Sequence, residues 1–382
     1  MQGKNIDVKK AVALYIHIPF CKKKCLYCDF PSYSGKEKLM VSYTKALARD
    51  IESVGDRKIR TIFIGGGTPT YLSLESWNNI YEVLKKINTE DNLEFTVEGN
   101  PGTFTEDKFK VLRKMGVNRL SIGLQAWQNS ILKCIGRIHT LEDFLKTYDM
   151  ARKFGFSNIN IDLMFGLPGQ TIKDWKESLQ NVVKLNPEHI SCYSLIVEKG
   201  TPFYNAHQSK SLNLPGEEEE RQMYYFTLDF LSKMGYEQYE ISNFSKKDRK
   251  CKHNLIYWDM EEYIGCGAGA HSYVDGYRYR NTKNIEEYIL QGNLNQFLRL
   301  DKHKNSICDS MEEFVFMGLR KIDGISTEDF YRRFNKDIYS VYGDVIEKYI
   351  KMGILIKEGH KLYLSKRGIE VSNSVMCDFI LT

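Results

Sequence analysis

The sequence lacks any apolar run near the length of about 20 residues that a membrane-spanning helix needs. Its first ten residues are mainly polar and charged, so we expect no secretory leader. Internal repeats and low-complexity linkers are also absent, which excludes a repeat architecture. Together these absences predict a cytoplasmic, globular protein with no transmembrane segment.

The sequence also has little excess of charge of one sign. Its 54 Lys and Arg residues stand against 49 Asp and Glu residues, a net charge of +5 over 382 residues. Binding of nucleic acid requires a clustered basic stripe, so we expect no nucleic-acid partner. The hydrophobic share of 42% is typical of a globular protein with a core. The length exceeds that of one ordinary domain, and it suits a barrel of βα units with a smaller appendage.

Nine cysteines are present, an odd number that is typical of reduced thiols in the cytoplasm. Three of them, Cys21, Cys25 and Cys28, follow one apolar run with the spacing C-x3-C-x2-C. A structural zinc ion takes four protein ligands. Three thiolates from one loop suit a cubane iron–sulfur cluster with one iron left open. The alternatives are a zinc site completed by His17 or Asp29, and three buried structural cysteines.

Four other cysteines have no motif around them, and we expect them to be small buried residues. They are Cys134, Cys192, Cys308 and Cys377.

Up to about residue 200, β-rich apolar runs alternate with amphipathic segments, as in βαβ units. Six such units predict a parallel sheet with right-handed crossovers. In βα barrels the chemistry gathers at the carboxyl ends of the strands, and the motifs described here fall there. The expected strands are 13–18, 61–64, 94–98, 119–125, 158–165 and 189–197, and the expected helices are 38–53, 73–87, 105–115, 141–154 and 172–185. Ser73 and Thr105 are the expected N-caps of two of these helices.

The pattern changes after about residue 215. A long helical segment over 217–234 leads into a stretch rich in glycine and aromatic residues. From about residue 305, short helices and the segment 354–363 are typical of a small, mainly helical, winged-helix-like domain. The sequence therefore predicts three parts, which are a core over 1–240, a segment over 241–300 that completes the core, and a C-terminal domain over 301–382.

The cysteine spacing, with the aromatic Tyr27 before the last cysteine, resembles the signature of the radical S-adenosylmethionine (SAM) superfamily. This resemblance implies a [4Fe–4S] cluster on Cys21, Cys25 and Cys28, with the methionine moiety of SAM on the open iron. It also implies an α/β fold, a partial (β/α)6 barrel that resembles an incomplete TIM barrel.

The run Gly-Gly-Gly-Thr-Pro-Thr over 65–70 resembles a narrower branch, which contains the oxygen-independent coproporphyrinogen III oxidase, HemN. The blocks 15–21, 98–102, 121–125, 137–139 and 162–169 resemble that branch too, and 301–382 resembles its C-terminal domain. Carboxylates can accept hydrogen bonds from ribose hydroxyls, and an arginine can pair with a carboxylate. The resemblance implies SAM sites lined by Tyr15, Gly66, Gly67, Thr68, Glu98, Gln125, Arg137 and Asp162, with Tyr27 packed on one of them.

Two features depart from the oxidase pattern. Phe30 stands where the oxidase has a further cysteine, and only about a dozen residues precede the first expected strand. The block His-Asn-Leu-Ile-Tyr-Trp over 253–258 resembles instead the haem chaperone branch, HemW. That resemblance implies a protein that binds haem and passes it to acceptor proteins such as respiratory enzymes. It favours a chaperone over an enzyme. The alternative is an oxidase that decarboxylates coproporphyrinogen by radical chemistry.

Haem requires an axial ligand and an apolar slot. His253, Tyr257 and Trp258 can supply both, with His271 and Cys266 as alternative ligands. The plainer interpretation is that the aromatic residues are core and that His253 is a hydrogen-bonded capping group. The sequence leaves open peripheral association with a membrane and the formation of a homodimer.

Overall fold

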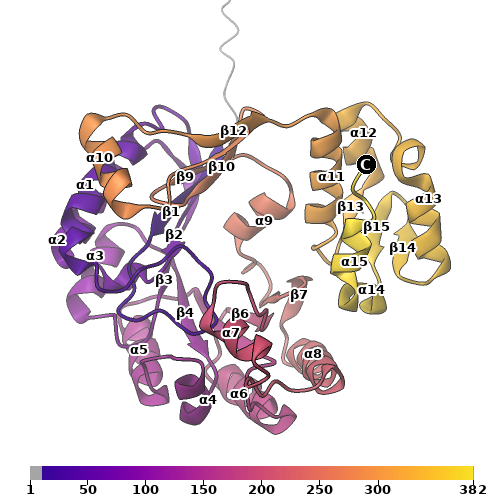
Figure 1. The fold of residues 1–382 in the computed structure, drawn as a ribbon, viewed down its shortest axis with the longest axis horizontal. Coiled ribbons are helices and arrows are strands. Elements are labelled where there is room, and N and C mark those ends of the chain that lie inside the picture. Colours follow the sequence, from indigo (N-terminus) through magenta and orange to yellow (C-terminus); the bar gives the residue numbers. More distant parts are fainter. Residues whose placement is uncertain (1–10, 382) are drawn as a thin grey trace, which may run out of the picture.

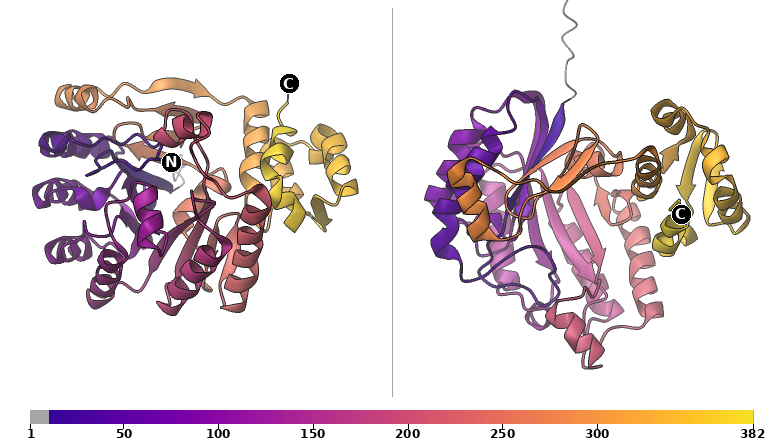
Figure 2. Two further views of the ribbon diagram at one scale, coloured as in Figure 1. Left: turned by 60° about the horizontal axis from the view of Figure 1, so that its bottom comes forward. Right: turned by 45° about the horizontal axis from the view of Figure 1, so that its top comes forward.

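The computed structural model describes residues 11–381, so the expectation for the first ten residues lies outside the described part of the chain. Strands β1 to β6 pair in parallel and in chain order, with helices on the outer face of the sheet (Figures 1 and 2). This confirms the predicted α/β fold with a partial (β/α)6 barrel. The elements are β1 (Val12–Ile18), α1 (Met40–Glu52), β2 (Ile59–Gly66), α2 (Leu74–Leu84), β3 (Thr89–Gly99), α3 (Glu106–Lys114), β4 (Arg119–Gln125), α4 (Asn129–Cys134), α5 (Leu141–Lys153), β5 (Ile159–Phe165), α6 (Ile172–Lys184) and β6 (His189–Ser194).

Helix starts in this part of the chain follow from the side chains at their N-caps. The predicted caps Ser73 and Thr105 accept hydrogen bonds from backbone N–H groups in the first turns of α2 and α3. Thr140 and Thr171 form capping boxes with acidic residues at the starts of α5 and α6. Such contacts satisfy backbone donors that have no partner within the helix.

Further strands extend the sheet at both edges, and the sequence pattern did not predict them individually. At one edge β8 (Asn243–Ser245) pairs with β6, and β7 (Glu237–Glu240) pairs with β8, both antiparallel. At the other edge β9 (Tyr263–Cys266) runs parallel to β1. It is followed by the antiparallel strands β10 (His271–Val274), β11 (Tyr277–Arg280) and β12 (Leu300–Lys304). Strands of three to five residues are too short for a clear alternation of polar and apolar positions.

A buried carboxylate holds the β9–β12 extension onto the barrel. Asp50, on α1, is fully buried and accepts hydrogen bonds from the Tyr288 hydroxyl (2.7 Å) and the backbone N–H of Gly267 (3.1 Å). It also pairs with the Arg299 guanidinium at 2.8 Å. Tyr288 lies on α10 (Ile285–Leu294), which packs against α1. Several charge-assisted hydrogen bonds compensate the cost of burying this carboxylate.

The connection from β8 to β9 crosses the molecule through α9 (Lys252–Trp258), which packs against β2 (Figure 1). Glu94 on β3 accepts hydrogen bonds from the backbone N–H groups of Lys252 and His253, both at 3.0 Å. A carboxylate is stabilised at a helix N-terminus, because the backbone N–H groups there are unpaired. Thr61 and Arg119 lie near the amino ends of β2 and β4 and border the same region. The helix α9 therefore closes the amino end of the barrel, which we call the floor.

The C-terminal part has its own hydrophobic core and the three-stranded sheet β13-β15-β14. It is mainly helical and lies beside the barrel (Figure 2). The predicted division at 240 and 300 stays a prediction. The remaining elements are α7 (Pro202–Gln208), α8 (Glu217–Lys233), α11 (Ile307–Gly318), β13 (Ile325–Ser326), α12 (Thr327–Phe334), α13 (Ile338–Lys351), β14 (Leu355–Glu358), β15 (Lys361–Leu364), α14 (Lys366–Glu370), α15 (Ser372–Cys377) and the 3₁₀ turns η1 (Glu37–Leu39) and η2 (Pro69–Tyr71).

One expectation about the cysteines was wrong in part. Cys192 is buried as expected, but Cys134, Cys308 and Cys377 are exposed, because they lie on outward-facing positions of α4, α11 and α15. No helix within residues 11–381 combines the length and the apolar character needed to span a membrane.

Candidate functional site

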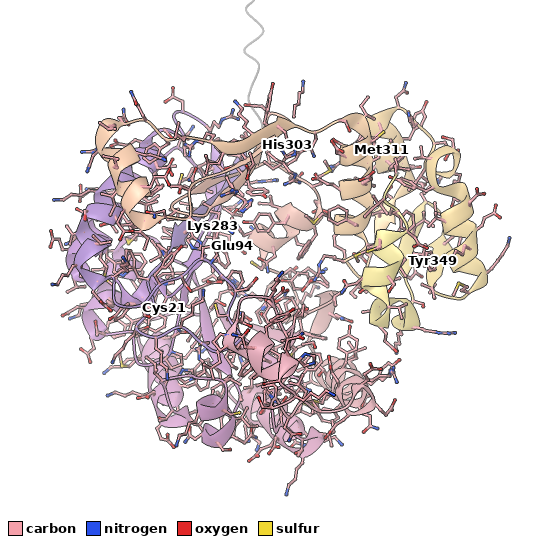
Figure 3. The ribbon with its side chains drawn as sticks, in the orientation of Figure 1. Cys21, Glu94, Lys283, His303, Met311 and Tyr349 are labelled. Atoms are coloured by element: carbon pink, nitrogen blue, oxygen red, sulfur yellow. The ribbon has the colours of Figure 1, made fainter. Side chains whose placement is uncertain are left out.

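A cavity of about 400 Å³ opens at the carboxyl ends of the barrel strands. Cys21, labelled in Figure 3, is part of its lining. This is the end of the barrel where the predicted motifs were expected to meet. Most of the predicted site residues line this one cavity: Cys21, Cys25, Tyr27, Cys28, Gly66, Gly67, Glu98, Gln125, Arg137 and Asp162. Of the residues predicted for SAM, Tyr15 and Thr68 do not line it.

The three cysteines all line the cavity, where Cys21 is buried and Cys25 and Cys28 are half-buried. The Thr68 hydroxyl donates a hydrogen bond to Cys21 Sγ (3.5 Å), and the Arg137 guanidinium approaches Cys25 Sγ at 3.6 Å. Burial raises the pKa of the Cys21 thiol, and the contact with Thr68 acts in the opposite direction. Donors aimed at sulfur stabilise its thiolate form, the form that binds metals.

The donor set suits an iron–sulfur cluster, which takes one thiolate on each of three iron atoms. Within residues 11–381, no three His, Cys, Asp or Glu side chains converge closely enough to chelate a single metal ion. A tetrahedral zinc site with bonds of 2.3 Å would bring sulfur atoms to about 3.8 Å from one another. A cubane binds each thiolate on a different iron atom, so its ligands spread around a cavity.

His17 is not available as a fourth zinc ligand, because both of its ring nitrogens are hydrogen-bonded. Nε2 donates to the carbonyl oxygen of Pro31 (2.8 Å), so Nδ1 accepts from the Tyr15 hydroxyl (2.9 Å). Burial lowers the pKa of His17 to about 4, so the ring is neutral at pH 7. Tyr15 and His17 thereby anchor the far end of the cysteine loop to β1.

The glycines after β2 make room for this loop. Gly66 has φ of +110°, and a Cβ there would meet the His17 ring at 2.5 Å. A Cβ on Gly67 would lie 2.8 Å from the Phe20 carbonyl oxygen and 3.0 Å from Cys21 Sγ. Glycine alone tolerates the positive φ at position 66, and only a residue without a Cβ fits the close contacts at positions 66 and 67.

The cavity wall carries two carboxylates with raised pKa values. Burial, and then the charge of Asp162, raise the pKa of Glu98 to about 7, and Glu98 accepts a hydrogen bond from Gly66 N–H (3.2 Å). Asp162 accepts hydrogen bonds from Ser121 (2.9 Å) and Asn160 (2.8 Å), and burial raises its pKa. Raised carboxyl pKa values in a cavity are typical of ligand sites.

Arg137 and Gln125 are also positioned by the fold. Arg137 is not a surface residue, since its guanidinium donates to Asn100 Oδ1 (2.6 Å) and to the Gly123 carbonyl. Gln125 ends β4 with φ of +73°, a left-handed conformation that is rare for residues with a Cβ and that clusters at functional sites. With two carboxylates, an arginine and an amide, the wall can bind hydroxyl groups and a carboxylate of a polar ligand.

Sequence reasoning missed several residues that line the same cavity, among them Asn100, Ser121, Tyr193, Ile196 and Glu198. Most of them lie at or directly after the carboxyl end of a predicted strand. The position at a strand end is the feature of the sequence that could have identified these residues. Asn100 also belongs to the block 98–102, which resembles the HemN branch.

The block 253–258 lies at the barrel floor, not at this cavity. His253 is 1% exposed, and its ring nitrogens contact the hydroxyls of Thr61 (2.8 Å) and Tyr257 (2.9 Å). Burial lowers the pKa of His253 to about 3. The Arg320 guanidinium covers the Trp258 ring at 4.5 Å and joins the C-terminal part to the floor. Haem binding by this block stays a prediction, and the geometry favours a structural role.

The rings near His253 form a continuous series. His253 stacks on Phe63 at 5.1 Å and contacts Tyr257 edge-on at 5.1 Å. The ring centroids of Phe63 and Tyr15 lie 6.3 Å apart, and those of Tyr15 and His17 lie 5.9 Å apart. The series runs from the floor to the residues that anchor the cysteine loop.

Comparison with known proteins places the chain in a family. The radical SAM superfamily matches residues 15–182, and the HemN C-terminal domain matches residues 308–371. Over 372 residues the chain is 39% identical to the haem chaperone HemW of Bacillus subtilis, covering 96% of this chain and 98% of that protein. It is 36% identical to HemW of Lactococcus lactis, covering 98% of each. The chain belongs to the HemW family.

Membership of this family of radical SAM proteins implies a [4Fe–4S] cluster and SAM. The solved coproporphyrinogen III oxidase HemN of Escherichia coli has the same fold, with a TM-score of 0.83 over 97% of this chain and 90% of that one. Its sequence identity is 22%, so the likeness concerns the fold alone.

We expect His253→Ala to destabilise the protein, because it leaves two buried hydroxyls without partners and opens a cavity under Phe63. The free energy of unfolding should fall by about 2–4 kcal/mol, measured by chemical denaturation under anaerobic conditions. The exposed variant His303→Ala is the matched control and should change stability by less than about 0.5 kcal/mol. An unchanged stability together with a lost haem spectrum would show instead that His253 is an axial ligand.

Proposed function

We propose that this chain is a haem chaperone, which binds haem and passes it to acceptor proteins. The observation that carries the proposal is the identity of 36–39% over nearly the whole chain to proteins named haem chaperone HemW. The oxidase alternative is less well supported, since identity to HemN is 22% and a likeness at that level concerns the fold. Phe30, at the position of a further cysteine in the oxidase pattern, also favours the chaperone.

We propose that Cys21, Cys25 and Cys28 hold a [4Fe–4S] cluster and that the cavity beside them holds SAM. Glu98 and Asp162 would accept hydrogen bonds from SAM hydroxyls, and Arg137 would pair with its carboxylate. Gly66 and Gly67 keep the wall free of side chains where the ligand approaches. The SAM set is completed by Gln125, Thr68, Tyr15 and Tyr27. When bound, the cluster supplies one electron to SAM.

The proposed partners are haem and haem-accepting proteins, and the proposed location is the cytoplasm. Respiratory enzymes are the class of acceptor that the family resemblance implies. Homodimer formation and peripheral membrane association belong to the same hypothesis.

The function is tested by anaerobic titration of the cluster-loaded protein with haem. We expect a Soret band that shifts on binding and saturates at a fixed stoichiometry. The oxidase alternative is tested in parallel with SAM, a reductant and coproporphyrinogen. Formation of protoporphyrinogen would overturn the chaperone assignment, and a lack of saturable haem binding would count equally against it.

The cluster ligands are tested by Cys21→Ala. We expect this variant to lose the brown colour and the iron and sulfide content of the reconstituted protein, because two thiolates do not hold a cubane. Cys308→Ala, at an exposed position on α11, is the matched control and should retain the cluster. Full iron retention in Cys21→Ala would show that the ligand assignment is wrong.

The raised pKa of Glu98 predicts that SAM affinity depends on pH. An ionised carboxylate accepts hydrogen bonds more strongly than a protonated one and attracts the sulfonium. Since the pKa is about 7, the ionised fraction rises about tenfold between pH 6 and pH 8, and SAM affinity should rise with it by up to that factor. Equilibrium dialysis with labelled SAM measures this change.

Glu98→Gln should remove most of this pH dependence, and the exposed variant Glu75→Gln should retain it. A flat pH profile in the unmodified protein would contradict the role given to Glu98.

A further inference from the structure

Large apolar side chains are exposed to solvent at the mouth of the cysteine cavity. Phe30 is 60% exposed, Tyr193 is 38% exposed and Ile196 is 63% exposed, and all three line the cavity. Phe30 comes from the end of the cysteine loop, and the other two come from the end of β6 and the segment after it. Exposed apolar side chains that gather at one place mark a binding surface. The polar wall deeper in the cavity suits SAM, but this apolar rim is left without a partner.

Three lysines lie beside the apolar rim, between Cys21 and Cys25. Lys23 and Lys24 line the cavity, and Lys22 and Lys23 line a small pocket that adjoins it. Lys24 donates a hydrogen bond to the Phe30 carbonyl (2.8 Å) and so joins the two parts of the rim. Lys22 and Lys23 are exposed, and no hydrogen bond or ion pair is seen for them within residues 11–381.

Two carboxylates, Asp29 and Glu198, line the same mouth. Lys23 and Lys24 balance these two carboxylates at the mouth, and Lys22 beside them adds a further positive charge along the segment 22–24. The mouth is therefore apolar at Phe30, Tyr193 and Ile196 and cationic along one side. A flat apolar ligand with negative groups on one edge would complement both features.

We propose that haem lies across this mouth. Its macrocycle packs against Phe30, Tyr193 and Ile196, and its two propionates face the lysines at 22–24. The proposal rests on the proposed function, since it is the haem cargo that supplies this combination of an apolar face and an anionic edge. The interior of the cavity remains for SAM, so that the bound haem covers SAM and the cluster.

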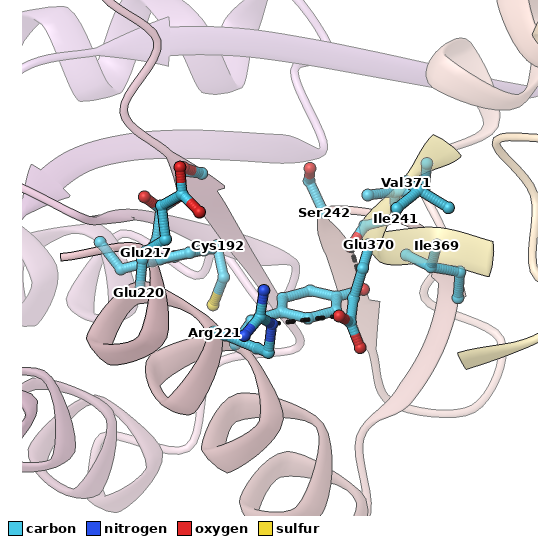
Figure 4. Close-up of a pocket in the computed structure, with 12 residues that line it drawn as sticks. Cys192, Glu217, Glu220, Arg221, Ile241, Ser242, Ile369, Glu370 and Val371 are labelled. Atoms are coloured by element: carbon cyan, nitrogen blue, oxygen red, sulfur yellow. Dashed lines mark hydrogen bonds and ion pairs between the residues drawn. The ribbon is translucent and has the colours of Figure 1, made fainter. Parts of the chain in front are cut away.

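Two other places in the structure suit haem less well. A second cavity, of about 350 Å³, lies between α8 and α14 (Figure 4). Its polar lining includes the carboxylates of Glu217, Glu220 and Glu370 and one guanidinium, Arg221, which already pairs with Glu370 at 3.2 Å. The one guanidinium in this lining is already paired, so no lining cation is left to face the propionates of haem. The floor around His253 is filled by side chains.

The cationic side of the site is tested by the double variant Lys22→Glu, Lys23→Glu in the full, cluster-loaded chain. We expect the haem Kd to rise at least tenfold, which corresponds to 1.4 kcal/mol, while iron and sulfide content stay unchanged. The matched control is Lys302→Glu, Lys304→Glu, which reverses two exposed lysines on β12 and should leave the Kd unchanged. Haem dimethyl ester, which lacks the propionate charges, should bind the unmodified protein and the double variant with similar affinity.

The apolar side is tested independently by Ile196→Asp, which lies outside the cysteine loop and should keep the cluster. We expect it to weaken binding of haem and of the dimethyl ester alike, by at least tenfold. If the unmodified protein binds haem and both variants bind it equally well, the site is wrong while the proposed function stands. If the unmodified protein does not bind haem, the proposed function fails and this site fails with it.

Discussion

An open barrel of six parallel strands must cover both its inner face and its two free edges. Backbone groups at an edge and apolar side chains on an inner face are costly to expose. In this fold β8 and β7 cover one edge and β9 to β12 cover the other. The helix α9, capped by Glu94, closes the amino end. Within residues 11–381 the carboxyl end of the barrel stays open to the cysteine cavity, so the location of this site follows from how the barrel is completed.

Polar side chains have different surroundings at the two ends of the barrel, the floor and the cavity. Polar groups at the floor, such as His253 and Thr61, contact one another and are hidden from solvent. Polar groups at the cavity, such as Glu98 and Arg137, face a space that a ligand can fill. The HemW-like block over 253–258 lies at the floor, and Phe30 and its neighbours, where we propose that haem binds, lie at the opposite end.

Much of the fold and of the polar cavity was predictable from the sequence. Strands β1 to β6 span six to eleven residues and alternate with amphipathic helices, and the cysteine spacing together with the strand-end positions predicted which side chains would meet. The short strands β7 to β12 gave no periodic signal. The position of His253 depends on Thr61, 192 residues away in the chain, and no local pattern reports such a contact. The exposure of Tyr193 and Ile196 is likewise a tertiary property.

The ring series from Tyr257 to His17 has a mechanical consequence. Packed rings restrict one another's movement, so we expect this wall to be rigid between the two ends of the barrel. The Arg320 guanidinium covers the Trp258 ring, next to Tyr257 at one end of the series. At the other end His17 is hydrogen-bonded to the Pro31 carbonyl. The contact with the C-terminal part and the anchor of the cysteine loop therefore lie at opposite ends of one packed row of side chains.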